Sequence, residues 1–111
     1  MKPSRINGLY AITPDINDSQ RLISMVDAAL AGGIDILQYR NKSTDKTLRM
    51  QQASELLLRC RAYHVPLIIN DDVDLASQIG ADGVHLGASD GSLIDARKKL
   101  GHSMLIGATC Y

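Results

Sequence analysis

The sequence has 111 residues, of which 45% are apolar and 22% are charged, and its 12 basic and 12 acidic residues cancel to a formal net charge of zero. These values are typical of one ordinary globular domain, and they exclude a general electrostatic attraction to nucleic acid or to a membrane surface. No apolar run approaches the roughly 18 residues that a membrane-spanning helix needs.

The first two predicted elements are a strand over residues 8–13 and the helix that follows it. Asp18 and Ser19 offer an N-cap for this helix, and Gly32-Gly33 stops it. Between these signals, apolar residues recur at helical spacing. They are Leu22, Ile23, Val26, Ala29 and Leu30.

A second strand is predicted over residues 34–39, and a second helix follows it. Either Ser43 or Thr44 is expected to cap this helix. Its buried stripe would consist of Leu48, Gln52 or Ala53, Leu56, Leu57 and Cys60. A third strand over residues 65–70 then leads into residues 73–79, which allow only a short helix.

The last part of the sequence predicts a fourth strand over residues 82–86 and the start of a fifth over residues 104–110. Between them lies a predicted helix that Asp90 can cap and Gly101 closes. Because strand and helix alternate throughout, the sheet should be parallel, with helices as the crossover connections.

The cysteines and the N-terminus both indicate a cytoplasmic protein. Cys60 and Cys110 lie too far apart for a zinc or CxxC spacing, so both are expected to be free thiols in a reducing compartment. Residues 1–5 lead directly into a strand pattern and contain no apolar region of a signal peptide.

Basic and amide side chains follow the second strand. Gln38 and Arg40 point to one side of it and Tyr39 to the other, because side chains alternate along a strand. Arg40 can grip a phosphate with two parallel hydrogen bonds, and Lys42 in the loop beyond adds a mobile positive charge. The segment predicts an anion site, although ordinary basic residues on a solvated rim would show the same pattern.

Carboxylates follow the third strand, in the segment Asn70-Asp71-Asp72. Mg²⁺ takes one or two carboxylates together with phosphate oxygens and water, so Asp71 with a second Asp from elsewhere would suffice. Alternatively, Asp71 or Asp72 caps the short helix, since Asn and Asp are favoured at N-caps. Both roles can hold at once, with one Asp capping and one binding. Asp90 allows the same two interpretations.

These polar groups are expected to meet, because the carboxyl ends of parallel strands lie at one edge of the sheet. Cationic groups beside carboxylates suit a phosphorylated ligand bridged to a hard cation. The pattern therefore predicts small phosphorylated substrates and Mg²⁺. His85, inside the fourth strand, is interpreted as a core or lining residue in preference to a catalytic one.

Five segments together resemble the thiamine-phosphate synthases in their order and spacing. They are residues 9–13 (LYAIT), Gln38-x-Arg40-x-Lys42, residues 68–71 (IIND), residues 80–87 (GADGVHLG) and residues 106–110 (IGATC). The resemblance covers essentially the whole chain. Each motif alone is modest evidence, and the combination is strong.

The resemblance implies a (β/α)₈ barrel that joins a hydroxymethylpyrimidine diphosphate to a thiazole phosphate and releases pyrophosphate. The residues that it implies for binding the pyrimidine diphosphate are Gln38, Arg40, Lys42 and Asn70. Asp71 and Asp90 would bind the bridging Mg²⁺, and Thr109 matches a position usually held by a small hydroxyl residue. Side chains pointing into the barrel would include Ile12, Ile36, Ile68 and Val84.

Two departures from the family pattern stand out. Ala88 occupies a position where the family usually has Gln. The second departure is the length. A barrel typically needs about 250 residues, so residues 1–111 are expected to form the N-terminal half of a single barrel domain. Such a half barrel exposes strand edges and is expected to self-associate. Two alternatives remain, a thiazole tautomerase-like barrel and a non-catalytic half-barrel fragment.

Overall fold

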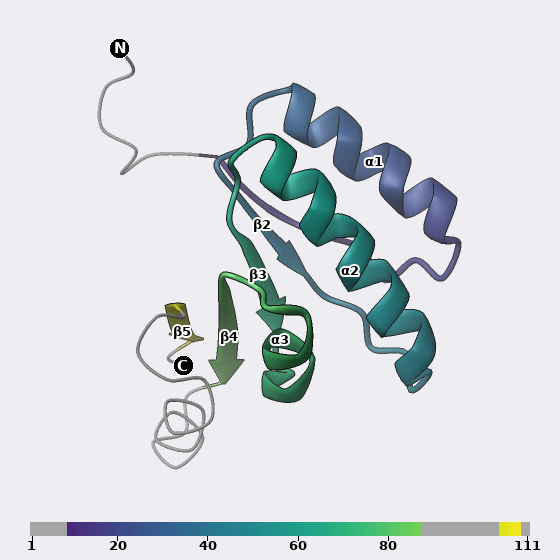
Figure 1. The fold of residues 1–111 in the computed structure, drawn as a ribbon, viewed down its shortest axis with the longest axis vertical. Helices are drawn as coiled ribbons and strands as arrows, with labels where there is room; N and C mark the ends of the chain where they lie inside the picture. Colours follow the sequence, from purple (N-terminus) through teal and green to yellow (C-terminus); the bar gives the residue numbers. More distant parts are fainter. Residues whose placement is uncertain (1–8, 88–104, 110–111) are drawn as a thin grey trace.

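The structure, a computed structural model, describes residues 9–87 and 105–109 and shows a parallel five-stranded sheet with helices packed beside it (Figure 1). The strands are β1 (Tyr10–Ile12), β2 (Ile36–Tyr39), β3 (Leu67–Asn70), β4 (Gly83–Gly87) and β5 (Leu105–Thr109). The helices are α1 (Ser19–Ala31), α2 (Lys46–Ala62) and α3 (Val73–Ile79). Strand and helix alternate through β4 as predicted, and each strand begins one or two residues later than expected.

The strands follow one another in the order β1-β2-β3-β4-β5, and every neighbouring pair is parallel. With right-handed crossovers, this order places the connecting helices on one face of the sheet, and α1 packs beside α2 and α2 beside α3. In a doubly wound sheet the strand order reverses at an internal strand. In a (β/α)₈ barrel, consecutive strands lie side by side in sequence order. The predicted α/β fold class is confirmed. None of the helices in the described ranges combines the length and apolar character that crossing a membrane requires.

Aspartates cap the helices, and one predicted cap is wrong. The Asp18 carboxylate accepts the Arg21 N–H at the start of α1, as predicted. For α2 the cap is Asp45, which accepts the Leu48 N–H at 3.0 Å, and neither Ser43 nor Thr44. Ser43 lies in a turn in which its N–H donates to Asn41 Oδ1 and its hydroxyl accepts the Asp45 N–H. Because of this turn, the helix cap lies one or two residues later than predicted.

The core lies between the sheet and the helices, and the strand register decides which residues enter it. Val84 pairs with Ile69 in the sheet, so both point toward the helices, and Val84 is fully buried there. The expectation that Val84 faces the barrel interior is therefore wrong. Gly83, opposite Ile68, takes the interior position instead. On α2, the alternative between Gln52 and Ala53 is resolved because both are buried.

The described cysteine, Cys60, is a free thiol with no exposed surface, as expected, and Cys110 lies outside the described residues. Burial, and secondarily the negative charge of Asp82, raises the pKa of Cys60 to about 12. Burial likewise raises the pKa of Tyr39 to about 12. Both groups are neutral when protonated, so the folded chain holds these protons more tightly than the unfolded chain does.

We expect the chain to lose stability as the pH rises from 9 toward 12, because Cys60 and Tyr39 ionise first in the unfolded state, with ordinary pKa values of 9.0 and 10.0. Urea midpoints measured across this range test the expectation. In Cys60→Ala, Tyr39 is the one of these two groups that is left, so the stability should begin to fall nearer pH 10. Midpoints that stay constant from pH 9 to 12 would contradict the assignment.

Candidate functional site

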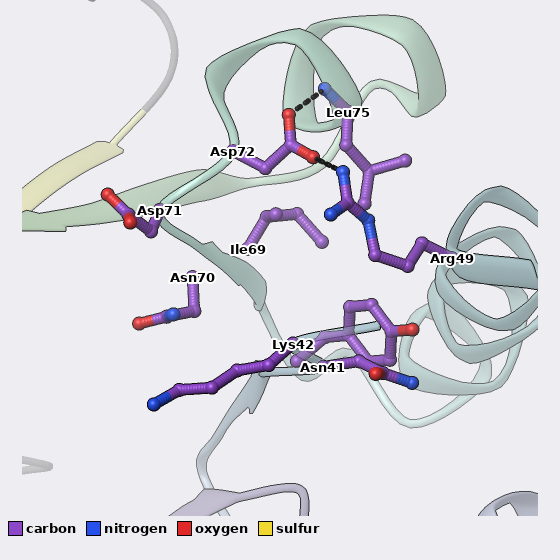
Figure 2. A pocket seen from close by; sticks show the side chains of 9 residues that line it. Asn41, Lys42, Arg49, Ile69, Asn70, Asp71, Asp72 and Leu75 are labelled. Atoms are coloured by element: carbon purple, nitrogen blue, oxygen red, sulfur yellow. Dashed lines mark hydrogen bonds and ion pairs between the residues drawn. The ribbon is translucent and has the colours of Figure 1, made fainter. Parts of the chain in front are cut away.

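A pocket of about 410 Å³ opens where β2 and β3 end, between the loops that follow them (Figure 2). It is lined by Tyr39, Asn41, Lys42, Arg49, Ile69, Asn70, Asp71, Asp72 and Leu75. Three of the predicted site residues therefore meet here. Figure 2 shows the side chains of Lys42, Asn70 and Asp71 extending to the same side of the pocket, away from Arg49. The expectation that polar groups from two strand ends converge is confirmed for these three.

Asp71 has an unusual backbone conformation. Its φ is 58°, in the left-handed region that few residues other than glycine adopt. Its N–H donates to the His85 carbonyl oxygen at 2.7 Å, which ties the end of β3 to β4. The carboxylate is exposed and has no hydrogen-bond partner among the described residues. Non-glycine residues held in this region cluster at functional sites, where surrounding contacts impose the strain.

Asp72 has the capping role that the sequence had left open between it and Asp71. One of its carboxylate oxygens accepts the Leu75 N–H at 3.0 Å and caps α3. The other pairs with Arg49 of α2. With Asp72 engaged in these two contacts, Asp71 is the carboxylate that remains available to a ligand.

Gln38 and Arg40 lie near the pocket but do not line it. Gln38 is 4% exposed, and its Nε2 donates to the Tyr10 hydroxyl at 2.6 Å. The guanidinium of Arg40 lies 3.7 Å from Asp15, and its backbone N–H donates to the Thr13 hydroxyl. The Lys42 N–H donates to Asp15 at 3.0 Å. The loop after β1 thus holds the loop that carries Arg40 and Lys42.

Of the remaining predicted residues, Thr109 ends β5 and pairs with Gly87, which places its backbone at the same edge of the sheet. Asp90 and Ala88 lie outside the described residues. His85 pairs with Asn70 on the interior face and is half-buried, in agreement with a lining position. The part of the chain that the structure describes contains no group of three His, Cys, Asp or Glu that could hold a metal. Mg²⁺ needs only one or two carboxylates beside phosphate oxygens and water, so the exposed Asp71 fits it.

Sequence reasoning missed a buried polar network under the pocket. Gln52 of α2 is 1% exposed, and its Oε1 accepts the Tyr39 hydroxyl at 2.6 Å and the Asn41 amide at 2.9 Å. Its Nε2 donates to the Ile16 carbonyl at 2.9 Å and to the Ser19 hydroxyl at 3.3 Å. The signal in the sequence was a polar residue within an apolar helical stripe. This network holds the first residues after β2, where the basic site residues lie.

Comparison with known proteins places the chain in a family. The family model described as thiamine monophosphate synthase matches residues 9–111. The chain belongs to this family. The thiamine-phosphate synthases of Chromobacterium violaceum and Methylobacillus flagellatus are each 55% identical to it, over 109 and 106 residues. These matches cover 98% and 96% of this chain but only 53% and 51% of the relatives, so the chain spans about half their length.

A solved structure agrees with this placement. The thiamine phosphate pyrophosphorylase from Pyrococcus furiosus matches with a TM-score of 0.80 and 31% identity, over 94% of this chain and 50% of that one. The family and the barrel-type arrangement that the motifs implied are therefore confirmed. The roles of individual site residues stay predictions.

Proposed function

We propose that this chain forms the diphosphate-binding and metal-binding part of a thiamine-phosphate synthase. Such an enzyme couples hydroxymethylpyrimidine diphosphate to a thiazole phosphate, giving thiamine phosphate and pyrophosphate. The observation that carries the proposal is the pocket in which Lys42, Asn70 and Asp71 extend to one side from two strand ends. The names of the relatives support the reaction class.

In this proposal the cationic and amide groups hold the diphosphate. Arg40 and Lys42 supply charge, and Gln38 and Asn70 supply uncharged donors. Asp71, with Asp90, holds Mg²⁺, which when bound neutralises charge on the departing pyrophosphate. The bond between the pyrimidine methylene and the diphosphate oxygen breaks, and the thiazole nitrogen forms a bond to that carbon. The reaction therefore needs no covalent nucleophile from the protein.

The test is a coupling assay with both phosphorylated substrates and Mg²⁺. We expect activity when the chain is joined to the remaining half of the Chromobacterium violaceum synthase, and its loss when EDTA removes the metal. The chain by itself is expected to be inactive, because it spans about half of its relatives. An inactive joined protein, assayed beside an active Chromobacterium violaceum enzyme, would contradict the proposal. Activity only as a thiazole tautomerase, which does not need the diphosphate, would favour the alternative. The proposal also includes a substrate-binding role for Thr109 and a cytoplasmic location for the protein.

We also expect the chain to form dimers or larger species in sedimentation velocity. Tyr10 and Ile12 lie on the interior face of the sheet and are 51% and 54% exposed. Among the described strands, β1 pairs on one side only, and an unpaired edge beside apolar surface favours association with a second copy. Ile12→Ser should shift the distribution toward monomer. A parent chain that stays monomeric at every concentration would contradict this expectation.

A further inference from the structure

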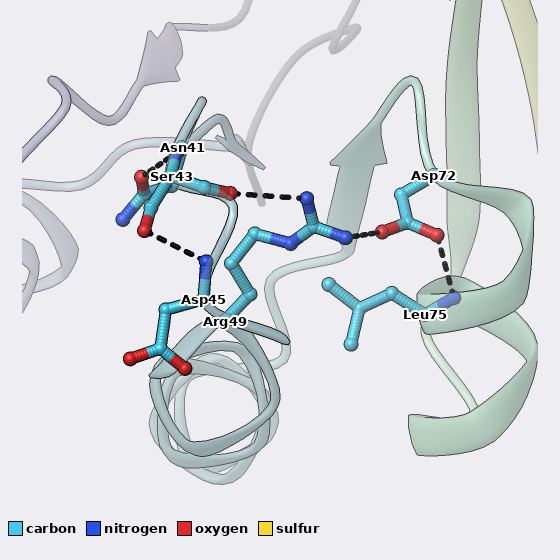
Figure 3. A network of polar contacts seen from close by, with 6 residues as sticks. All are labelled: Asn41, Ser43, Asp45, Arg49, Asp72 and Leu75. Atoms are coloured by element: carbon cyan, nitrogen blue, oxygen red, sulfur yellow. Dashed lines mark hydrogen bonds and ion pairs between the residues drawn. The ribbon is translucent and has the colours of Figure 1, made fainter. Parts of the chain in front are cut away.

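Arg49 contacts both loops that border the pocket (Figure 3). It lies in the first turn of α2, and its Nη1 donates to the Ser43 carbonyl oxygen at 3.2 Å. Its Nη2 pairs with the Asp72 carboxylate. The two partners lie 29 positions apart in the sequence, one after β2 and the other after β3. One guanidinium therefore joins the two loops.

Each of these loops carries one part of the proposed site. Ser43 directly follows Lys42, which supplies positive charge for the diphosphate. Asp72 directly follows Asp71, the proposed metal ligand. In Figure 2 the Arg49–Asp72 pair lies on the opposite side of the pocket from the ends of Lys42 and Asp71. Arg49 therefore contacts the neighbours of both functional residues without extending to their side of the pocket.

The Arg49–Asp72 pair is partly buried, and the guanidinium uses two of its three nitrogens to contact the two loops. The side chains of Arg49 and Asp72 are 24% and 22% exposed, so solvent screens the pair only in part. The Nε of Arg49 is buried and has no hydrogen-bond partner in the described part of the chain. A buried donor without a partner is unfavourable, so the contacts that the other two nitrogens make with the two loops have to offset this cost. A planar fork suits this task, whereas the single ammonium of a lysine does not.

We propose that Arg49 is a positioning residue that sets the spacing between the diphosphate-binding loop and the metal-binding loop. This inference rests on the proposed function. Asp72 couples the same contact to the start of α3, because its second oxygen caps that helix. Arg49 would thereby keep Asp71, which would hold Mg²⁺, and Lys42, which would bind the diphosphate, in a fixed relation at one pocket. Loss of Arg49 should therefore weaken the cooperation between metal and anion more than the binding of the anion alone.

Calorimetric titration with inorganic pyrophosphate is carried out once with Mg²⁺ and once with EDTA. The ratio of the Kd in EDTA to the Kd with Mg²⁺ measures that cooperation. The parent chain should bind pyrophosphate more tightly with Mg²⁺. In Arg49→Gln this ratio should fall about tenfold, the lower end of the loss caused by removing an outer-shell partner of a metal site. The Kd in EDTA should change much less. Arg49→Lys should behave like Arg49→Gln, because it keeps the charge and loses the fork.

Arg59→Gln is the matched control, since Arg59 lies on the same helix and pairs with Asp27 and Glu55 away from the pocket. It should leave the ratio unchanged. Asp72→Asn gives a second route to the result, because Asn still caps a helix but loses the charge that pairs with Arg49. Its ratio should also fall, and the double variant with Arg49→Gln should be no worse than either single variant.

Three outcomes would overturn the inference. An equal loss of affinity with Mg²⁺ and with EDTA would show that Arg49 contacts the anion itself. A lower melting temperature with an unchanged ratio would show that the pair only stabilises the fold. A parent chain that gains no affinity from Mg²⁺ would overturn the proposed site and this inference together.

Discussion

Replacing Asp71 with Asn is expected to remove nearly all of the tightening of pyrophosphate binding by Mg²⁺. The loss should be on the order of 100-fold or more, because a direct ligand contributes at least as much as an outer-shell partner, whose removal costs about 10- to 100-fold. The physical reason is that Asp71 has the pocket's exposed carboxylate, while Asp72 is already engaged by Arg49 and by the start of α3. Titration calorimetry with and without Mg²⁺ measures the effect.

Asn is the replacement of choice because it removes the charge without changing the backbone conformation at position 71. Asp71 has a φ of 58°, and Asn is among the non-glycine residues that tolerate this region best. An alanine there would combine loss of the carboxylate with backbone strain. Asp90→Asn should match Asp71→Asn, although Asp90 lies outside the described residues.

Two neighbouring aspartates provide the controls for this prediction. Asp72→Asn should lower the Mg²⁺ effect about tenfold, through Arg49. Asp74→Asn, on the exposed first turn of α3 and outside the pocket lining, should leave it unchanged. Equal effects at Asp71, Asp72 and Asp74 would mean that general negative charge, and not a ligand position, controls the metal.

Gln52→Leu is expected to lower the free energy of unfolding by about 2–4 kcal/mol, because a leucine satisfies none of the buried groups that Gln52 bonds. The Tyr39 hydroxyl would lose its acceptor, and the Ile16 carbonyl would lose its donor. Asn41, next to Lys42, would lose its anchor as well. Urea unfolding monitored by circular dichroism measures the change.

Gln51→Leu is the matched control on the same helix. Gln51 is exposed, and surface substitutions away from special features usually change stability by less than about 0.5 kcal/mol. If the Gln52 and Gln51 variants unfold at the same urea concentration, the buried network contributes nothing measurable to stability.

The elements that were predicted well are those with local signals. The short helix at residues 73–79 has the predicted bounds, and Asp18 caps α1 as expected. Gly33, after α1, has a φ of 95°, a conformation that glycine adopts without strain. The cap of α2 was misplaced because Ser43 enters a turn with Asn41, and a contact between side chain and backbone in a loop leaves no periodic pattern to read.

The orientation of β4 was misjudged for a related reason. An apolar run covered on both faces has no alternation, so the sequence does not say which of its residues point inward. Pairing of Val84 with Ile69 decides the matter, since paired residues of neighbouring strands share a face. Arg49 was missed because one basic residue on a helix resembles any solvated position until its partner on another loop is known.

By itself, the sequence determined the alternation of strand and helix, the family motifs, and which polar residues leave the sheet at its carboxyl edge. These depend on residue type and on spacing over a few positions, which hydrophobic periodicity and turn residues encode locally. Only the tertiary structure decided that Asp72 caps α3 while Asp71 is exposed, and that Gln52 and Arg49 hold the loops of the pocket. Those roles depend on contacts between segments far apart in the chain, which exist only once the strands have paired and the helices have packed on them.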